Sequence, residues 1–192
     1  MVVHFKKYLF ISFCLINLFG CNRTPTGVRP VSDFDIHKYL GIWYEIARLD
    51  HSFERDLIEV YANYTLRDDG GIKVVNRGKN NDNGKWKEAI GKAYFINEKN
   101  IGSLKVSFFW PFYGGYHIAK LDKDYSMALI VGPNLNYAWI LSRSENPSME
   151  LCEEYFAAAS QLEIKKISGS KLEVAYNYSI KAILLILVLD FF

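Results

Sequence analysis

Beyond Pro30, apolar and polar residues alternate along the chain, which is the pattern of strands that bury one face. The clearest run, 58–66, places Ile58, Val60 and Ala62 on one side and largely polar residues between them. Clusters rich in Asp, Asn and Gly at 68–71 and 80–84 mark turns between such runs. The alternation predicts eight strands, at 43–50, 58–66, 72–77, 86–95, 103–109, 115–122, 126–131 and 137–142.

The connections between these predicted strands are short, which favours antiparallel neighbours. Eight such strands can close into an up-and-down barrel, and closure removes the exposed edges on which sheets aggregate. Near the end of the chain, Asn146 is a plausible N-cap and Pro147 suits the first helical position. Apolar residues then recur at helical spacing, namely Leu151, Cys152, Tyr155, Phe156, Ala159 and Leu162. We therefore predict an all-β fold, an eight-stranded antiparallel up-and-down β-barrel with one C-terminal α-helix packed on it.

The first residues have the design of an export signal. Lys6 and Lys7 precede an almost wholly apolar run at 8–19, which ends at Gly20 and Cys21. Such a run is too short for a stable transmembrane anchor, so we assign residues 1–20 to a signal peptide. The polar residues that follow, rich in Pro and Gly, suit a tether at 21–32, before a folded region at 33–167.

Residues 168–192 form an atypical tail with an apolar stretch at 182–189. This stretch is too short to cross a bilayer, which requires about 20 residues. An extra strand, a membrane-surface patch and the product of a frameshifted reading frame are three interpretations of the tail, of which we prefer the last.

The formal net charge of +2 comes from 23 basic and 21 acidic residues. Lys6 and Lys7 leave with the predicted signal peptide, so the mature chain is neutral. A neutral chain lacks the clustered positive surface with which nucleic-acid-binding proteins neutralise phosphates. We therefore expect no nucleic-acid partner.

The sequence contains no Gly-x-Ser-x-Gly, His-Glu-x-x-His or Cys-x-x-Cys motif and no phosphate-binding glycine loop. His37, His51 and His117 are dispersed, so we predict no catalytic residue, no metal site and no cofactor. His117 is a candidate haem ligand only if it faces inward. Cys152 is a lone thiol on the predicted helix, where a small apolar packing role is the ordinary one.

Three short motifs resemble those of a known family. The first is Gly41-Ile-Trp43, after a predicted helical turn at 35–40; the second ends in Asn136-Tyr137, and the third ends in Arg143. In this order and spacing they resemble the motifs of the lipocalin family, over roughly residues 33 to 167, and the stretch 105–115 resembles its bacterial members. The resemblance implies that Trp43 plugs the closed end of the barrel, that Arg143 lies across its ring, and that these residues are structural. Gly41 would permit a tight entry into the first strand.

The end of the predicted signal peptide, Leu18-Phe19-Gly20-Cys21, resembles the lipobox of bacterial lipoproteins. The resemblance implies that Cys21 becomes the N-terminal residue, with diacylglycerol on its thiol and an acyl chain on its α-amine. Several acyl chains on one residue anchor a protein stably, whereas one binds a membrane marginally. Asn22 instead of Asp after the cysteine resembles the sorting signal for the outer membrane. We therefore expect a lipid-anchored protein of the bacterial outer membrane that faces the periplasm.

An eight-stranded barrel can enclose one small ligand when its inward side chains leave room. The alternation gives ten apolar and aromatic lining candidates: Val60, Ala62, Tyr64, Tyr94, Val106, Phe108, Tyr116, Ile118, Leu129 and Trp139. With the resemblance, this lining favours a stored or transported lipid, either a fatty acid or a lysophospholipid. Haem or another pigment is the first alternative, and a hydrolase or isomerase on the same fold is the second. A completely filled interior and a homodimer are left open.

The predicted loop at 110–113 carries three aromatic residues beside a Gly-Gly pair. Such residues suit a gate at the barrel mouth or a contact with a membrane, where Trp and Tyr rings sit at the interface. Packing of the loop on itself is the simpler interpretation.

Overall fold

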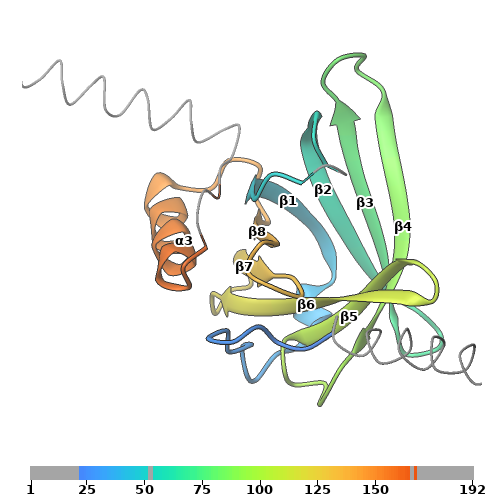
Figure 1. Ribbon diagram of the computed structural model, residues 1–192, viewed down its shortest axis with the longest axis vertical. Coiled ribbons are helices and arrows are strands. Elements are labelled where there is room, and N and C mark those ends of the chain that lie inside the picture. The colour runs from blue at the N-terminus through green and yellow to red at the C-terminus, as the bar shows by residue number, and fades with distance from the viewer. Residues whose placement is uncertain (1–21, 52–53, 165–166, 168–192) are drawn as a thin grey trace, which may run out of the picture.

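The computed structural model describes residues 22–51, 54–164 and 167, and shows a closed β-barrel with a helix beside it (Figure 1). The strands are β1 (Gly41–Arg48), β2 (Leu57–Leu66), β3 (Ile72–Asn80), β4 (Trp86–Phe95), β5 (Ser103–Phe109), β6 (Phe112–Leu121), β7 (Met127–Val131) and β8 (Ala138–Ser142). Each pairs antiparallel with the next, and β1 also pairs with β8. The predicted fold class is confirmed. β6 begins earlier than predicted, because Phe112 pairs directly with Phe109 across a tight turn.

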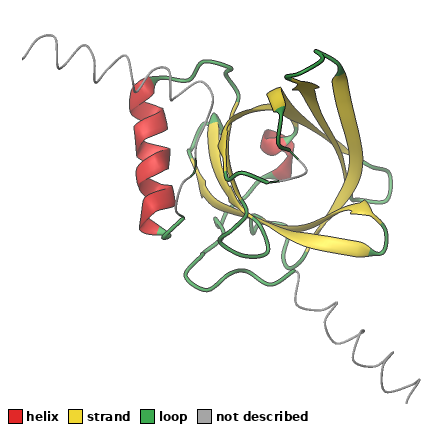
Figure 2. Cartoon of the chain, turned by 45° about the horizontal axis from the view of Figure 1, so that its top comes forward, coloured by secondary structure: helices red, strands yellow, loops and turns green. Residues whose placement is uncertain are grey.

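One end of the barrel is closed by the segment that precedes β1. The backbone N–H of Phe34 donates to the carbonyl of Asn100 (2.9 Å), and that of Asp35 donates to the hydroxyl of Tyr125 (2.8 Å). The short helix α2 (Ile36–Tyr39) then crosses this end, and Figure 2, which looks into the barrel, shows the helix within the ring of strands. The four connections β1–β2, β3–β4, β5–β6 and β7–β8 surround the opposite, open end.

Trp43 fills the barrel next to α2 and is completely buried. Its indole N–H donates to the carbonyl of Tyr39 (2.8 Å), and the guanidinium carbon of Arg143 lies 4.1 Å from its ring centre. The guanidinium also donates to the carbonyls of Leu40 and Ile42, at 2.8 and 2.7 Å. Arg143 therefore holds the end of β8 against the turn that leads from α2 into β1.

Gly41 is the position at which this arrangement requires glycine. Its φ is +95°, which side-chain-bearing residues rarely adopt. A Cβ atom there would lie 3.3 Å from a guanidinium nitrogen of Arg143. Gly41, Trp43 and Arg143 thus form one structural unit that closes the barrel.

Helix α3 (Met149–Gln161) packs on the outside of the barrel beside β7 (Figure 1). Its residues Cys152 and Tyr155 are buried, and the Tyr155 hydroxyl donates to the carbonyl of Met127 (2.8 Å). The predicted start of this helix was wrong. Its N-cap is Ser148, whose hydroxyl accepts a hydrogen bond from the N–H of Leu151, so Asn146 and Pro147 precede the helix.

Residues 22–32, which we expected to form a tether, run along the outside of the barrel. The N–H of Val31 donates to the carbonyl of Ile118, and the N–H of Gly102 donates to the carbonyl of Val31, both at 2.9 Å. The hydroxyl of Thr24 lies 3.5 Å from Nδ1 of His117. The segment is therefore attached to β6 and to the connection that precedes β5.

The predicted signal peptide, the lipidation candidate Cys21 and the tail at 168–192 lie outside the described residues. Within the described ranges, no helix is both long and apolar enough to cross a membrane.

Candidate functional site

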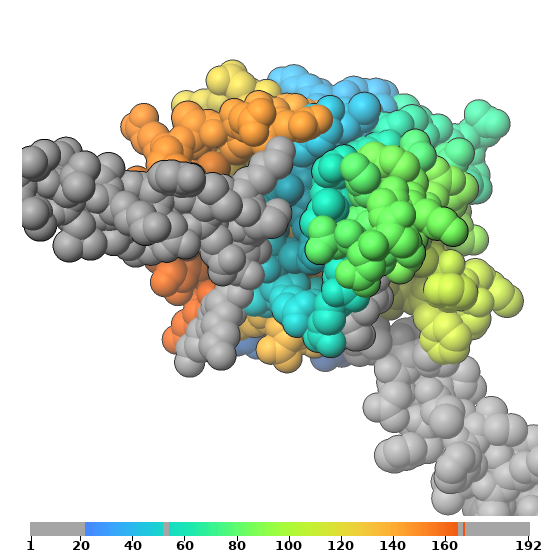
Figure 3. All heavy atoms as spheres, turned by 90° about the horizontal axis from the view of Figure 1, so that it is seen from above, coloured from blue at the N-terminus to red at the C-terminus, as the bar shows by residue number. Residues whose placement is uncertain are grey.

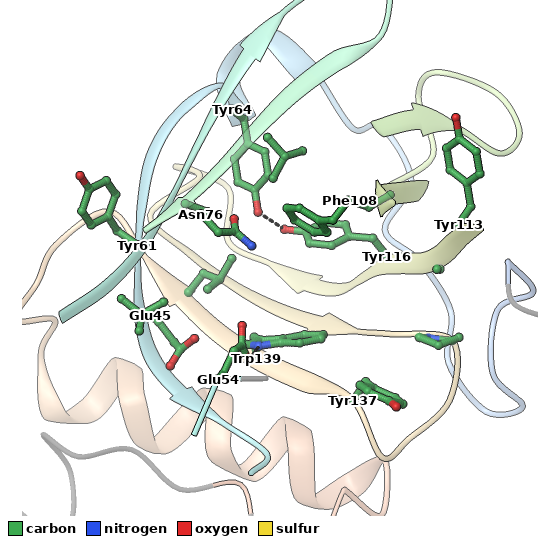
Figure 4. A pocket seen from close by; sticks show the side chains of 18 of the residues that line it. Glu45, Glu54, Tyr61, Tyr64, Asn76, Phe108, Tyr113, Tyr116, Tyr137 and Trp139 are labelled. Carbon is green, nitrogen blue, oxygen red and sulfur yellow. Dashed lines mark hydrogen bonds between the residues drawn. The ribbon is translucent and has the colours of Figure 1, made fainter. Parts of the chain in front are cut away.

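The open half of the barrel contains a cavity of about 440 Å³. Side chains from β1, β2, β3, β5, β6 and β8 line it, since successive residues of a strand point to opposite faces of the sheet. Figure 4 shows Tyr64 and Asn76 on one side, Phe108 and Tyr116 on another, and Trp139 across from them. The wall is mainly aromatic and aliphatic, which suits an apolar ligand.

Seven of the ten lining candidates are part of this wall. The structure places Val60, Ala62, Tyr64, Val106, Phe108, Tyr116 and Trp139 around the cavity. The interior is therefore not completely filled by their side chains, and the open-cavity interpretation replaces the filled one.

The other three candidates lie elsewhere, and each has a physical reason. Leu129 packs in the core between the barrel and α3, because its neighbour Ile130 is the residue that pairs with inward-facing Trp139. Tyr94 points out of the barrel and donates a hydrogen bond to Asp69 (2.9 Å).

Ile118 is completely buried, but it belongs to the core that fills the closed end. It packs there with Trp43 and Phe34, below the cavity. The alternation correctly predicted that Ile118 lies on the inner side of β6. It did not show that side chains fill the barrel interior at this level, so that the cavity ends above Ile118.

Several lining residues were missed by the sequence analysis, including Glu45, Glu54, Asn76 and Tyr137. Glu45 lies two positions after the buried Trp43 on β1, so the period of two could have placed it inside. Glu54 lies in the β1–β2 connection, where no periodic pattern exists. Tyr137 comes directly before β8 and two positions before Trp139, so the period of two could have placed it inside as well.

The cavity has an acidic side formed by Glu45 and Glu54 (Figure 4). Glu45 forms an ion pair with Arg48, and the carboxylate of Glu54 accepts a hydrogen bond from the indole N–H of Trp139 (3.0 Å). Burial raises the pKa of Glu45 from 4.5 to about 7, although Arg48 opposes the shift. Burial also raises the pKa of Glu54, against the Trp139 hydrogen bond. Both carboxyl groups are therefore costly to keep charged here.

Three tyrosine hydroxyl groups meet at the bottom of the cavity. The Tyr116 hydroxyl lies 2.7 Å from that of Tyr39 and 3.0 Å from that of Tyr64. Burial raises the pKa of Tyr64 to about 12 and the pKa values of Tyr39 and Tyr116 well above their ordinary value. These groups are neutral hydrogen-bonding partners at physiological pH.

The tip of the β5–β6 hairpin is an exposed aromatic surface beside the cavity mouth. Phe109, Trp110 and Phe112 are 81%, 76% and 61% exposed, and Phe109 and Phe112 also line the cavity. The hairpin, yellow-green in Figure 3, lies at the edge of the molecule. Apolar lining thus continues from the interior to the surface, a form of exposure that marks interaction sites.

His117 does not face the cavity. It is buried on the outer side of β6, where Nδ1 lies 2.9 Å from the hydroxyl of Ser103, and burial lowers its pKa. This removes the geometric condition on which a haem-ligand role depended. In the part of the chain that the structure describes, no three His, Cys, Asp or Glu side chains come together as a metal site.

The cavity wall offers little for nucleophilic catalysis. Its described lining contains no Ser, Cys or His, and its hydroxyl groups belong to tyrosines. Cys152 is buried under α3, outside the barrel, and burial raises the pKa of its thiol.

Comparison with known proteins agrees with this geometry. The family model for a lipocalin-like domain matches residues 34–175. The outer membrane lipoprotein Blc of Vibrio cholerae is 49% identical over 156 residues, which are 81% of this chain and 91% of that protein. Its namesake from Escherichia coli K12 is 53% identical over 137 residues, 71% of this chain and 77% of that one.

More distant proteins share the same region. Apolipoprotein D of Macaca fascicularis is 30% identical over 160 residues, covering 78% of this chain and 84% of that protein. Among solved structures, insecticyanin of the tobacco hornworm Manduca sexta superposes with a TM-score of 0.58 at 20% identity, covering 76% and 85% of the two chains, which shows a shared fold. With the Gly41-Ile-Trp43 and Arg143 closure, the eight-stranded barrel and the family match over most of its length, this chain belongs to the lipocalin family.

Proposed function

We propose that the protein is a lipoprotein of the bacterial outer membrane that binds a single-chain lipid, a fatty acid or a lysophospholipid, in its barrel. The observation that supports this most directly is the apolar cavity of about 440 Å³, whose lining continues to the exposed aromatic hairpin tip. Ligand pockets commonly have volumes of about 300–1,000 Å³. The function is storage or transport of the lipid, with no chemical step.

Burial of the acyl chain supplies the affinity. Apolar surface removed from water contributes about 25 cal/mol per Å², and a long acyl chain exposes enough surface for micromolar binding after the entropic cost of association. The aromatic and aliphatic side chains around the cavity, such as Val106 and Phe108, provide the matching surface. Tyr116 and the other hydroxyl groups at the bottom of the cavity are paired with one another, so an apolar chain end leaves them satisfied.

The place of action follows from the N-terminal residues and the relatives. Leu18-Phe19-Gly20-Cys21 resembles a lipobox, and relatives at 49–53% identity are named outer membrane lipoproteins. A triacylated Cys21 would hold the barrel at the outer membrane, on its periplasmic side. A lipid-binding barrel at that position is next to its source of ligand.

The experiment is native mass spectrometry of the full-length protein extracted from its own membrane. We expect a covalent mass that corresponds to acylation and a non-covalent mass of one single-chain lipid. After the bound lipid is removed, a fluorescent fatty acid should bind saturably.

A cavity-filling variant makes the test specific. Ala62→Phe adds a ring at a position that lines the cavity and should weaken binding at least about tenfold, which corresponds to about 1.4 kcal/mol. Ala157→Phe adds the same ring on the exposed side of α3 and should bind as the wild type does. No saturable binding by the wild type, or equal binding by both variants, would refute the proposal.

A further inference from the structure

The charged side chains of the cavity wall are all acidic. Among the residues that line the cavity in the described ranges, Glu45 and Glu54 are the only charged ones, and no Lys, Arg or His accompanies them. The amide oxygen Oδ1 of Asn76, also in the wall, is buried and has no hydrogen-bond partner among the described residues. The polar side chains of the wall thus include two carboxyl groups and one neutral amide (Figure 4).

The nearby guanidinium of Arg48 offsets only one of the two negative charges. Arg48 pairs with Glu45 and also donates to the backbone carbonyls of Glu54 (2.8 Å) and Leu57 (3.0 Å), so its donors point at the chain rather than at the cavity. One cation therefore accompanies two carboxylates. Glu45 accepts the Arg48 hydrogen bond through one carboxylate oxygen, and Glu54 accepts the Trp139 hydrogen bond through one.

This environment is unfavourable for a ligand carboxylate and favourable for a cation. Burial already penalises the charged forms of Glu45 and Glu54, and a second anion close to them would add repulsion. A positively charged nitrogen relieves the same penalty, and its N–H groups, where it has them, can donate to the carboxylate oxygens. The rings of Trp139 and Tyr137, which line the same space, add cation–π attraction.

We propose that the Glu45–Glu54 side of the cavity binds the positively charged nitrogen of a lipid headgroup, so that single-chain lipids with an amine or quaternary ammonium group are preferred over fatty acids. This inference rests on the proposed function, because it assumes that the cavity holds a single-chain lipid. It names the class within that function: the headgroup carries a cation, and Glu45 and Glu54 determine the specificity.

The test compares ligands with the same chain and different headgroup charge. Dodecyltrimethylammonium, dodecanol and laurate are titrated at neutral pH, below their micellar concentrations, into the full-length protein freed of bound lipid. We expect the cation to bind about tenfold more tightly than the alcohol, and laurate to bind most weakly. A second pair, lysophosphatidylethanolamine and lysophosphatidylglycerol of equal chain length, shows whether the preference extends to phospholipid headgroups or is limited to simple amines.

Variants assign the preference to the two carboxylates. In the Glu45→Gln, Glu54→Gln double variant, the ratio of cation to alcohol affinity should fall close to one. Glu54→Gln alone should lower it several-fold, and this milder variant keeps the test valid if the double variant does not fold. Glu59→Gln removes an equal charge from an exposed position on β2, so the ratio should match that of the wild type.

The outcomes separate this inference from the function on which it rests. If the alcohol or laurate binds as tightly as the cation, or if the preference survives both substitutions, the specificity assignment is wrong while lipid binding stands. If none of the three ligands binds, the proposed function fails and this inference fails with it.

Discussion

The guanidinium of Arg143 lies 4.1 Å from the ring centre of Trp43, although one hundred residues separate them, and it closes the barrel at the end opposite the cavity. Neither side chain lines the cavity. The Trp43–Arg143 pair of the family motifs thus stabilises the closed end, and other residues line the cavity. Substitutions at the two ends of the barrel should therefore have separable effects.

Trp43→Ala should lower the free energy of unfolding by roughly 3–5 kcal/mol, because it leaves a large hole in the closed end and removes the ring beneath Arg143. Urea-induced unfolding followed by circular dichroism measures this. Trp86→Ala is the matched control, since that ring is 46% exposed on β4 and should contribute less than about 1 kcal/mol. Equal losses in the two variants would contradict the role assigned to Trp43.

The stability of the protein should depend on pH through Glu45. The folded protein holds the Glu45 proton up to a pKa of about 7, against 4.5 for an ordinary glutamate, so the unfolded chain binds fewer protons between these values. The free energy of unfolding should therefore fall as the pH rises from about 4.5 to about 7, by on the order of 2–3 kcal/mol from this group. Below that window the contribution is fully present, and above it the contribution is lost.

Comparison of the wild type with Glu45→Gln isolates this effect from other titrating groups. The variant should lack the corresponding part of the slope, and Glu88→Gln, at an exposed site on β4, should keep it. Parallel curves for the wild type and Glu45→Gln would show that Glu45 titrates normally.

Cys21→Ser should abolish acylation and normal processing of the signal peptide, and the protein should no longer sediment with outer membranes. Mass spectrometry and fractionation measure these changes. The barrel, which begins well beyond residue 21, should still bind acyl ligands. Because a membrane-surface patch is one interpretation of the apolar stretch at 182–189, a truncation after Lys171 is combined with Cys21→Ser. Membrane attachment that survives both changes after a high-salt wash would refute lipid anchoring.

Phe109→Ser with Trp110→Ser should slow the uptake of lipid from vesicles without lowering stability, because both side chains are more than three-quarters exposed. Stopped-flow fluorescence of a labelled fatty acid measures the rate, and thermal unfolding measures stability. Ile90→Ser, which removes an exposed apolar side chain from β4, serves as the control. An unchanged uptake rate would contradict a role of the aromatic tip in lipid uptake.

The alternation predicted the strands and the closure of the barrel, and it failed where burial is two-sided. All five residues of β7, Met127 to Val131, are buried, because the barrel interior covers one face and α3 covers the other. An uninterrupted apolar run does not show which face is which, so Leu129 was placed inside. On β1, by contrast, the alternation was informative, but a charged Glu45 was not expected in an apolar interior.

Other features of the site depend on contacts distant in sequence. Glu54 enters the cavity wall from a connection because the indole of Trp139, far along the chain, holds its carboxylate. The start of α3 depends on which of several neighbouring residues acts as the N-cap. In the structure the N-cap is Ser148 and not Asn146. Periodicity carries no information about such choices, whereas the family motifs at Trp43 and Arg143 predicted their contact.

Because Thr24 and Val31 contact the barrel, only a few residues connect the barrel to Cys21. If Cys21 carries the lipid, the three residues from it to Thr24 extend at most about 11 Å, so the wall that bears His117 lies within that reach of the bilayer. Such a protein cannot diffuse away from the membrane on a long arm. The same hairpin, β5–β6, carries this attachment towards one end and the aromatic tip at the other. A lipid on Cys21 would therefore hold the outer wall of β6 near the membrane and restrict the orientations that the barrel can adopt there.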